Sequence, residues 1–309
     1  MTPTILVTGA TGVQGGATAR ELLAKNIHVR AFVRNLASPA ALSLQKLGAE
    51  LAQGDFDDVP AITAAVTGVS GVFLNTYPSF TDPDAEVRYA QNFVTAALAA
   101  QTVKTFVVST VYKAGEKAVL AAATPKYPFL AFYFSRKAGV EDVVRAGGFA
   151  HVTILRPDWL SYNYLAPGCD IHFPEYRSDR VITVSYAQDY KLNHFDPEDV
   201  GKFAAAAFVE PSRFQGTIEL SDEALTFDEI AEIISRVSGV EVKAKFRTEE
   251  ETKVLIEAGT LPVLASQLWA KEVSFEREPL ERYGIKLGSL EGYLERERSR
   301  LLETLRVGL

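Results

Sequence analysis

The stretch TILVTGATGVQGG, residues 4–16, decides the fold class of this chain. A short apolar run predicts a buried strand, and three evenly spaced glycines, Gly9, Gly12 and Gly15, lead from it into a helical stretch. In such a loop one glycine permits the tight turn, one lets the backbone approach a pyrophosphate, and one lets the helix pack closely on the sheet. The pattern predicts a dinucleotide-binding loop; the alternative is a glycine-rich turn without a ligand. No Gly-Lys-Ser/Thr follows, which excludes an ATPase phosphate loop.

Short apolar runs alternate with longer stretches rich in alanine and leucine as far as residue 157. Strands are predicted at 4–9, 28–34, 49–55, 71–75, 105–110 and 151–157, and helices at 16–26, 38–48, 59–68, 84–101 and 133–148. This alternation implies right-handed crossovers and a doubly wound parallel sheet. The strands are continuous apolar runs, as expected when helices cover both faces of the sheet.

The regular alternation ends after Pro157. Residues 158–180 are rich in aromatic residues, prolines and glycines, and this composition favours loops that line a pocket. Further helices are predicted at 196–211, at 226–239 and, as one amphipathic helix, at 289–306, with a strand at 216–221. Thr226 and Glu229 have the spacing of a capping box. The chain is therefore predicted to be an α/β protein with a Rossmann-type domain, residues 1–157 plus about 196–222, and a smaller C-terminal α+β substrate domain, about 158–195 and 223–309.

The composition excludes several classes of function. Of 309 residues, 47% are apolar and 23% charged, which is typical of a globular protein. The net charge of −7 argues against nucleic acid as a partner, and no apolar run approaches the roughly 20 residues of a membrane span. A single cysteine, Cys169, and the lack of a signal peptide favour the cytoplasm. The histidines lie far apart, so no metal site is expected, and a monomer or a homodimer remains open.

The end of the second predicted strand indicates which dinucleotide would bind. A site for NAD usually has an acidic residue here, whereas this chain has Arg34 followed by Asn35. A guanidinium suits the 2′-phosphate of NADP(H), and the alternative is a solvated surface arginine. After the third strand, Asp55 can accept from an adenine amino group and Phe56 can cover its ring. The other predicted cofactor-binding residues are Thr11, Val13, Gln14, Asn75, Thr76 and Pro157.

Residues 133–137, YFSRK, place Tyr133 and Lys137 one helical turn apart on the same face. None of the other 11 tyrosines has a lysine at this spacing. The alternative interpretation is aromatic packing, because Tyr133 lies between Phe132 and Phe134.

Together, the motifs VTGATGVQGG, AFVRN, GDFDD, SRKAGVEDVVRAGG and HVTILRP resemble the NmrA-like group of atypical short-chain dehydrogenases/reductases. The resemblance implies a Rossmann domain, a small C-terminal domain and a preference for NADP(H). By similarity to extended short-chain reductases, Tyr133 would donate a proton, Lys137 would hold the nicotinamide ribose, and Ser109 or Thr110 would orient the substrate oxygen.

These observations predict an NADP(H)-dependent reductase of a carbonyl or conjugated double bond in a small hydrophobic substrate, such as an aromatic, quinone-like or natural-product compound. The resembling group also contains redox sensors, so the second hypothesis is a catalytically silent NADP(H)-binding protein that regulates a protein partner. An isomerase or cyclase that uses the same cleft is the third. The predicted substrate contacts are Tyr112, Trp159, Tyr162 and Asn163.

Overall fold

The structure is a computed structural model that describes residues 3–79, 81–116, 119, 127–259, 264–270 and 277–305. Its contacts divide the chain into two compact units. The first contains Met1–Leu120, Phe132–Pro157 and Pro197–Leu220, and the second contains Ala121–Ala131, Asp158–Asp196 and Ser221–Leu309.

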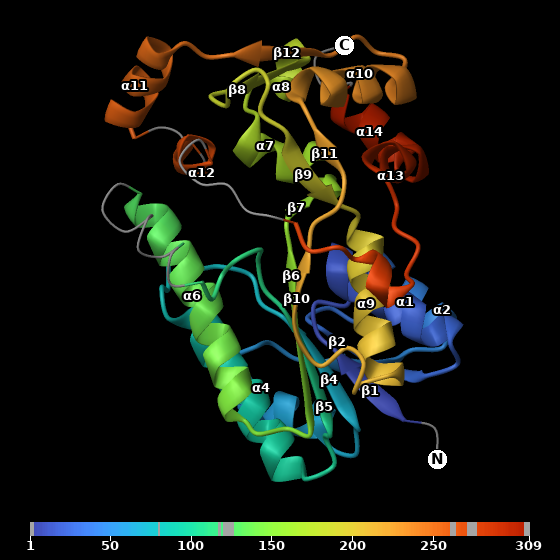
Figure 1. The fold of residues 1–309 in the computed structure, drawn as a ribbon. Helices are drawn as coiled ribbons and strands as arrows, with labels where there is room; N and C mark the ends of the chain where they lie inside the picture. The colour runs from blue at the N-terminus through green and yellow to red at the C-terminus, as the bar shows by residue number, and fades with distance from the viewer. Residues whose placement is uncertain are drawn as a thin grey trace. The chain divides into compact units, whose positions relative to one another are not determined.

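A parallel sheet of seven strands forms the centre of the first unit (Figure 1). Its order is β10-β6-β5-β4-β1-β2-β3, which confirms the predicted Rossmann-type fold. The strands are β1 Thr4–Val7, β2 His28–Val33, β3 Glu50–Gln53, β4 Gly71–Asn75, β5 Thr105–Ser109, β6 His151–Pro157 and β10 Gly216–Leu220. The carboxyl ends of these parallel strands share one edge of the sheet, which is where ligands bind in doubly wound folds.

Helices cover both faces of this sheet, with α4 and α6 on one side and α1 and α9 on the other (Figure 1). Side chains from Phe93 of α4 and Val140 of α6 join Leu6, Val72 and Phe106 of the strands in one buried cluster. The helices are α1 Val13–Ala24, α2 Pro39–Lys46, α3 Val59–Val66, α4 Ala85–Ala100, α6 Pro128–Ala146 and α9 Pro197–Val209. Helix α6 begins at residue 128 rather than 133, because proline is well suited to the first position of a helix.

The second unit has more regular structure than the sequence predicts. Residues 158–180 form short elements rather than loops, so that prediction is wrong. Packing of aromatic side chains stabilises these elements: Tyr164 and Phe173 are fully buried and stack with their ring centroids 5.7 Å apart. The elements are β7 Trp159–Leu160, η1 Ser161–Tyr164, α7 Gly168–His172, α8 Tyr176–Asp179, β8 Val181–Val184, β9 Leu192–Phe195, β11 Ala224–Leu225, β12 Lys243–Phe246, α11 Glu249–Glu257, α12 Leu264–Trp269 and η2 Glu281–Tyr283.

The C-terminal helices of the second unit show one confirmed prediction and one correction. Helix α10, Phe227–Ser238, begins with the predicted capping box between Thr226 and Glu229. The single helix predicted at 289–306 is instead two helices, α13 Leu290–Arg296 and α14 Arg298–Leu305. Just after the break, Arg298 donates from Nε to the carbonyl oxygen of Val237 at 2.9 Å, and this bond ties the start of α14 to the last turn of α10.

Candidate functional site

The glycine loop between β1 and α1 has the geometry of a phosphate-binding turn. Gly9 has φ +58°, a conformation that favours glycine, and its carbonyl oxygen accepts from the N–H of Gly12 at 2.8 Å. A Cβ on Gly15 would lie 2.3 Å from the oxygen of Gly9, so only glycine allows this approach. Helix α1 has no side-chain cap and no acidic residue in its first turn. Its N-terminal N–H groups therefore fit an anionic pyrophosphate.

The segment after β2 holds the residues predicted to recognise the 2′-phosphate. Arg34 and Asn35 are both exposed. The backbone around them is fixed, because Asn35 Oδ1 accepts from the N–H of Ala37 at 2.9 Å and Gln53 Nε2 donates to the Arg34 oxygen at 3.1 Å. Arg34 thus lies in a turn that hydrogen bonds hold in place. The contact of its guanidinium with a 2′-phosphate stays a prediction.

The residues predicted at the adenine end differ in their surroundings. Asp55 is exposed, whereas the half-buried ring of Phe56 packs edge-on against Phe93 at 5.1 Å and Tyr89 at 5.5 Å. The backbone oxygen of Phe56 also accepts from Asn92 Nδ2 at 2.9 Å. This loop is therefore held against α4, and the role of Phe56 as a cover for adenine stays a prediction.

Three strand ends and the start of α1 meet through hydrogen bonds. The N–H of Asn75, at the end of β4, donates to Thr8 Oγ1 at 3.1 Å. Ser109, at the end of β5, donates from Oγ to Gln14 Oε1 at 2.6 Å and accepts at its backbone oxygen from Asn75 Nδ2 at 3.4 Å. Gln14 and Asn75, both predicted to bind the cofactor, thus lie beside Ser109, which is predicted to be catalytic.

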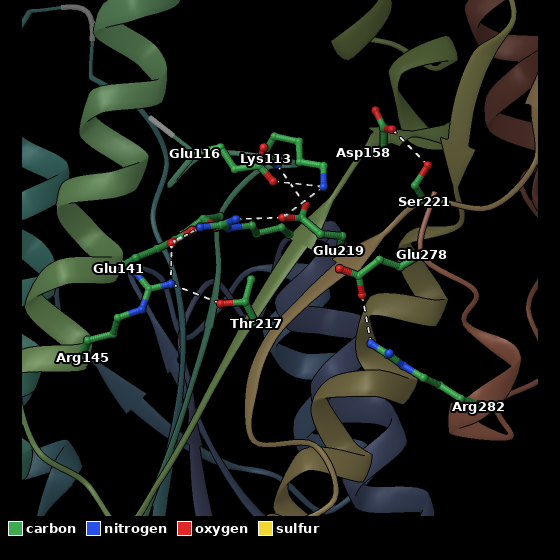
Figure 2. Close-up of polar contacts among 12 residues, drawn as sticks. Lys113, Glu116, Glu141, Arg145, Asp158, Thr217, Glu219, Ser221, Glu278 and Arg282 are labelled. Carbon is green, nitrogen blue, oxygen red and sulfur yellow. Dashed lines mark hydrogen bonds and ion pairs between the residues drawn. The ribbon is translucent and has the colours of Figure 1, made fainter. Parts of the chain in front are cut away.

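The other predicted hydroxyl, that of Thr110, has a different partner. Thr110 is buried and donates from Oγ1 to Glu141 Oε1 of α6 at 2.7 Å. Arg156 of β6 donates to both oxygens of the same carboxylate, at 2.8 and 2.6 Å, and to Glu219 Oε1 of β10 at 2.7 Å. Figure 2 shows Glu141 and Glu219 in this network, together with Lys113. The proton of Thr110 is therefore committed to a carboxylate, whereas Ser109 faces the glycine loop.

Burial and ion pairing have opposite effects on the pKa values of the charged groups in this network. Burial raises the pKa of Glu219, although its hydrogen bond from the N–H of Lys113, at 2.9 Å, and its contact with Arg156 lower it. Burial also opposes the charge of Arg156, but Glu141 and Glu219 together raise its pKa above the ordinary value. A Cβ on Gly115 would lie 2.2 Å from Arg156 Nη2, so the loop after β5 approaches the guanidinium without room for a side chain.

Lys137 of α6 reaches the loop after β4. Its Nζ donates to the backbone oxygen of Thr76 at 2.9 Å and to Glu86 Oε1 of α4 at 2.5 Å. Thr76 Oγ1 donates to the same carboxylate oxygen at 2.8 Å, and all three residues are buried. Burial lowers the pKa of Lys137, and the adjacent carboxylate raises it. Lys137 therefore lies beside Thr76, which is predicted to bind the cofactor, and Glu86 is a partner that we did not predict from the sequence.

Tyr133 has both an aromatic neighbour and a nearby lysine, as the sequence suggested. It is half-buried and packs against Phe134, with ring centroids 5.8 Å apart. Lys137 Nζ lies 5.7 Å from the centre of the Tyr133 ring. Tyr112, a predicted substrate contact, is largely buried, and its N–H donates to the oxygen of Pro157 at 2.9 Å.

The remaining predicted substrate contacts belong to the second unit. Trp159 and Tyr162 are half-buried and pack against its core, and the ring of Trp159 lies 4.5 Å from that of His172. Asn163 is half-buried in η1. Their contact with a substrate stays a prediction.

Within the ranges given above, no three His, Cys, Asp or Glu side chains are grouped so as to hold a metal ion. No helix in the same ranges is both long and apolar enough to cross a membrane.

The parallel sheet and its glycine loop define a Rossmann-type α/β protein. More specifically, the chain belongs to the NmrA-like family, whose model matches residues 1–293. It is 30% identical over 259 residues to an NmrA-like family domain-containing protein of Dictyostelium discoideum, which covers 80% of this chain and 81% of that protein. It is 33% identical over 238 residues to the (4-alkanoyl-5-oxo-2,5-dihydrofuran-3-yl)methyl phosphate reductase of Streptomyces griseus, covering 76% and 74%. A shorter match, 43% identical over 112 residues, covers 34% of this chain and 33% of the NmrA-like oxidoreductase notA of an Aspergillus species.

Solved structures share the fold over nearly the whole chain. NmrA, a negative transcriptional regulator crystallised with NAD, has a TM-score of 0.72 at 22% identity and covers 100% of this chain and 98% of that one. The triphenylmethane reductase of Citrobacter sp. has a TM-score of 0.71 at 23% identity, covering 97% and 99%. The quinone oxidoreductase QOR2 of Escherichia coli has a TM-score of 0.67 at 24% identity, covering 95% and 99%.

Proposed function

We propose that this protein is an NADP(H)-dependent reductase of a carbonyl or conjugated double bond in a small hydrophobic substrate. One observation carries the proposal: Gln14, at the start of α1, is hydrogen-bonded to Ser109 at 2.6 Å. This bond joins the glycine loop, which suits a dinucleotide, to the hydroxyl that suits a reacting oxygen. The names of two relatives, an oxidoreductase and a reductase, support the same reaction class.

Three features of the first unit support NADP(H) as the cofactor. The uncapped start of α1 suits the pyrophosphate, Gly15 allows α1 to pack closely on the backbone of Thr8 and Gly9, and Arg34 presents an exposed guanidinium for the 2′-phosphate. When bound, the nicotinamide supplies the hydride. Triphenylmethane reductase crystallised with NADP(H) and QOR2 crystallised with NADPH have this fold, which supports the same cofactor.

In the proposed reaction the chain's own residues act as follows. Tyr133 donates a proton to the substrate oxygen, and the ammonium of Lys137 favours the ionised phenol that remains. Ser109 orients the substrate oxygen when its hydroxyl proton turns from Gln14 Oε1 to that oxygen. We assign Ser109 rather than Thr110 to this role, because Ser109 is bonded to Gln14 at the start of α1, beside the glycine loop, whereas Thr110 is bonded to the buried carboxylate of Glu141.

The substrate class is inferred from the second unit and from the relatives. Aromatic side chains, among them Trp159, Tyr164 and Phe173, form much of that unit's core, and partly buried Trp159 suits a planar hydrophobic ligand. The name of the Streptomyces griseus relative describes an unsaturated lactone that bears an alkanoyl group and a methyl phosphate group. Quinones, enones and aromatic carbonyl compounds are therefore the substrates to test.

The test is NADPH oxidation, followed by absorbance, with a panel of quinones, enones and aldehydes. We expect Tyr133→Phe and Ser109→Ala each to lower kcat by about 100-fold or more, because each removes a group that acts on the reacting oxygen. Thr110→Val is the matched control and should keep a larger share of the activity than Ser109→Ala. Equal turnover in Tyr133→Phe and the native protein would disprove the assigned proton donor.

Cofactor choice is tested separately by binding. Arg34→Gln should weaken NADPH binding by about 10-fold or more and leave NADH binding nearly unchanged, because a charge-assisted pair with the 2′-phosphate contributes about 1.5–3 kcal/mol. Lys46→Gln, an exposed cation on α2, is the control and should change neither affinity. An equal loss for both dinucleotides in Arg34→Gln would contradict the 2′-phosphate role.

A second function, a dinucleotide sensor, is favoured by the likeness to the fold of NmrA, a transcriptional regulator. Such a protein binds the dinucleotide and regulates a protein partner without turnover. Tight NADPH binding with no consumption across the panel, and no effect of Tyr133→Phe on binding, would favour the sensor over the reductase.

A further inference from the structure

Helices α4 and α6, which lie on the same face of the sheet (Figure 1), are joined by a buried ion pair. Lys137 of α6 is 3% exposed, Glu86 of α4 is 2% exposed, and Nζ lies 2.5 Å from Oε1. Thr76 completes the arrangement from the loop after β4, by its backbone oxygen to Nζ and by its hydroxyl to the same carboxylate oxygen. Three separate elements thus converge on one ammonium group.

We propose that Glu86 is a positioning residue of the reductase: it holds Lys137 as an ammonium group against the end of β4, and thereby fixes the charge and placement of the residue that serves Tyr133. The proposal rests on the proposed function. It assigns Glu86 no contact with the substrate.

The surroundings of Lys137 make its charge depend on Glu86. A buried ammonium without a counter-ion loses its proton readily, because burial disfavours the charged form. Among the described residues, the carboxylate that contacts Nζ is that of Glu86, the titratable neighbour on α6 is Tyr133, and the loop after β4 contributes only the uncharged Thr76. Burial lowers the pKa of Lys137, and the Glu86 carboxylate raises it. Removal of the carboxylate should therefore lower the pKa of Lys137, so that the lysine loses its proton at a lower pH.

The carboxylate of Glu86 also has one oxygen that makes no hydrogen bond within the described part of the chain. Glu86 Oε2 is buried and accepts no hydrogen bond from the described part of the chain, while Oε1 accepts from both Lys137 and Thr76. Buried polar atoms are satisfied in the great majority of cases, and the exceptions call for an explanation such as a catalytic role. Both hydrogen bonds of this side chain are thus concentrated on the oxygen that contacts the lysine.

The same two elements carry a matched control. Asp84, which precedes α4, accepts from Arg136 of α6 at 2.7 Å. This pair also joins a carboxylate near the start of α4 to a cation of α6, but the Asp84 side chain is 75% exposed. Exposed pairs contribute little, so Asp84→Asn should leave the ionisation of Lys137 unchanged.

The experiment titrates Lys137 directly by NMR of protein labelled with ¹³C at the lysine ε-carbon, with the signal assigned by its loss in Lys137→Met. We expect Glu86→Gln to move the titration midpoint of Lys137 down by at least one pH unit, and Glu86→Asp and Asp84→Asn to move it by less than half as much. With a substrate found in the panel, the decline of kcat at alkaline pH should also shift to lower pH in Glu86→Gln. Glu86→Asp and Asp84→Asn should not show this shift. An unchanged midpoint in Glu86→Gln would overturn the proposal.

Two further outcomes distinguish the role of Glu86 from the reductase function and from a purely structural role. A shifted midpoint in a protein that consumes no panel substrate supports the control of Lys137 by Glu86 and contradicts the reductase function. If Glu86→Gln does not fold, the double variant Glu86→Gln/Lys137→Met decides, because it removes both charges. Recovery of folding supports the counter-ion role, whereas a double variant that also fails to fold overturns it in favour of packing.

Discussion

Replacement of Arg156 by methionine tests how strongly the network at the ends of β5, β6 and β10 stabilises the first unit. The guanidinium makes two hydrogen bonds to Glu141 and one to Glu219, and both carboxylates are buried. Breaking a buried ion pair from one side destabilises a protein by about 3–5 kcal/mol. Here each carboxylate keeps a donor, Thr110 Oγ1 for Glu141 and the N–H of Lys113 for Glu219, so we expect a loss within that range rather than twice it.

The pH dependence of this loss gives a second, independent check. Burial already raises the pKa of Glu219, and Arg156 lowers it, so Arg156→Met should raise the pKa further. A carboxyl group whose pKa is higher in the folded than in the unfolded state binds more protons when folded, and folding is then favoured as the pH falls. The difference between variant and native protein should therefore shrink between pH 8 and pH 5.

Urea unfolding followed by far-UV circular dichroism at both pH values measures these differences. Arg145→Met is the matched control: Arg145 also contacts Glu141, at 3.1 Å, but its side chain is 43% exposed. Such a contact contributes up to about 1 kcal/mol. The reasoning is refuted if Arg156→Met costs no more stability than Arg145→Met, or if its loss is the same at both pH values.

Two other predictions concern the glycine loop and the second unit. Gly15→Ala should abolish tight NADPH binding, measured by fluorescence titration, because its Cβ would lie 2.3 Å from a backbone oxygen. Gly16→Ala, where the Cβ would lie 3.1 Å from a backbone oxygen, should retain more affinity. Equal affinities in the two variants would contradict this reasoning. Burial lowers the pKa of His172 and of His194 to about 4, so the stability that their neutral forms confer is complete above about pH 6.5 and is lost as the pH falls toward 4. Each should contribute a slope of up to about 1.4 kcal/mol per pH unit to the unfolding free energy measured in urea, and His194→Gln should reduce that slope.

The fold of the first unit could be predicted from the sequence because local signals and burial agree there. Strands β4 and β6 have the predicted bounds, 71–75 and 151–157, since continuous apolar runs fill a sheet that is covered on both faces. The charged residues inside β6 and β10 were a further signal, which indicates how these strands pair. Arg156 and Glu219 are each flanked by apolar residues, and they pair directly across β6 and β10. Two opposite charges in adjacent buried strands predict an ion pair, which the sequence interpretation passed over.

The parts that could not be predicted depend on contacts distant in the sequence. Glu86 lies in the first turn of α4, where an acidic residue is also favoured by the helix dipole, so nothing local distinguishes its role. Its partner Lys137 is 51 residues away. The short elements of residues 158–180 likewise depend on aromatic packing, such as that of Phe173 on Phe227, rather than on periodicity.

Residues beyond the immediate neighbours of Tyr133 hold its face of helix α6 in place. Tyr133, Lys137 and Glu141 follow one another at intervals of one turn, so they share a face of the helix. Lys137 ties that face to the loop after β4, and Glu141 ties it to Thr110 after β5 and to Arg156 in β6. A shift of one residue would rotate the face by about 100° and break all of these bonds at once. The two buried ion pairs therefore hold the face of α6 that carries Tyr133 in one position, as the proposed proton donor requires.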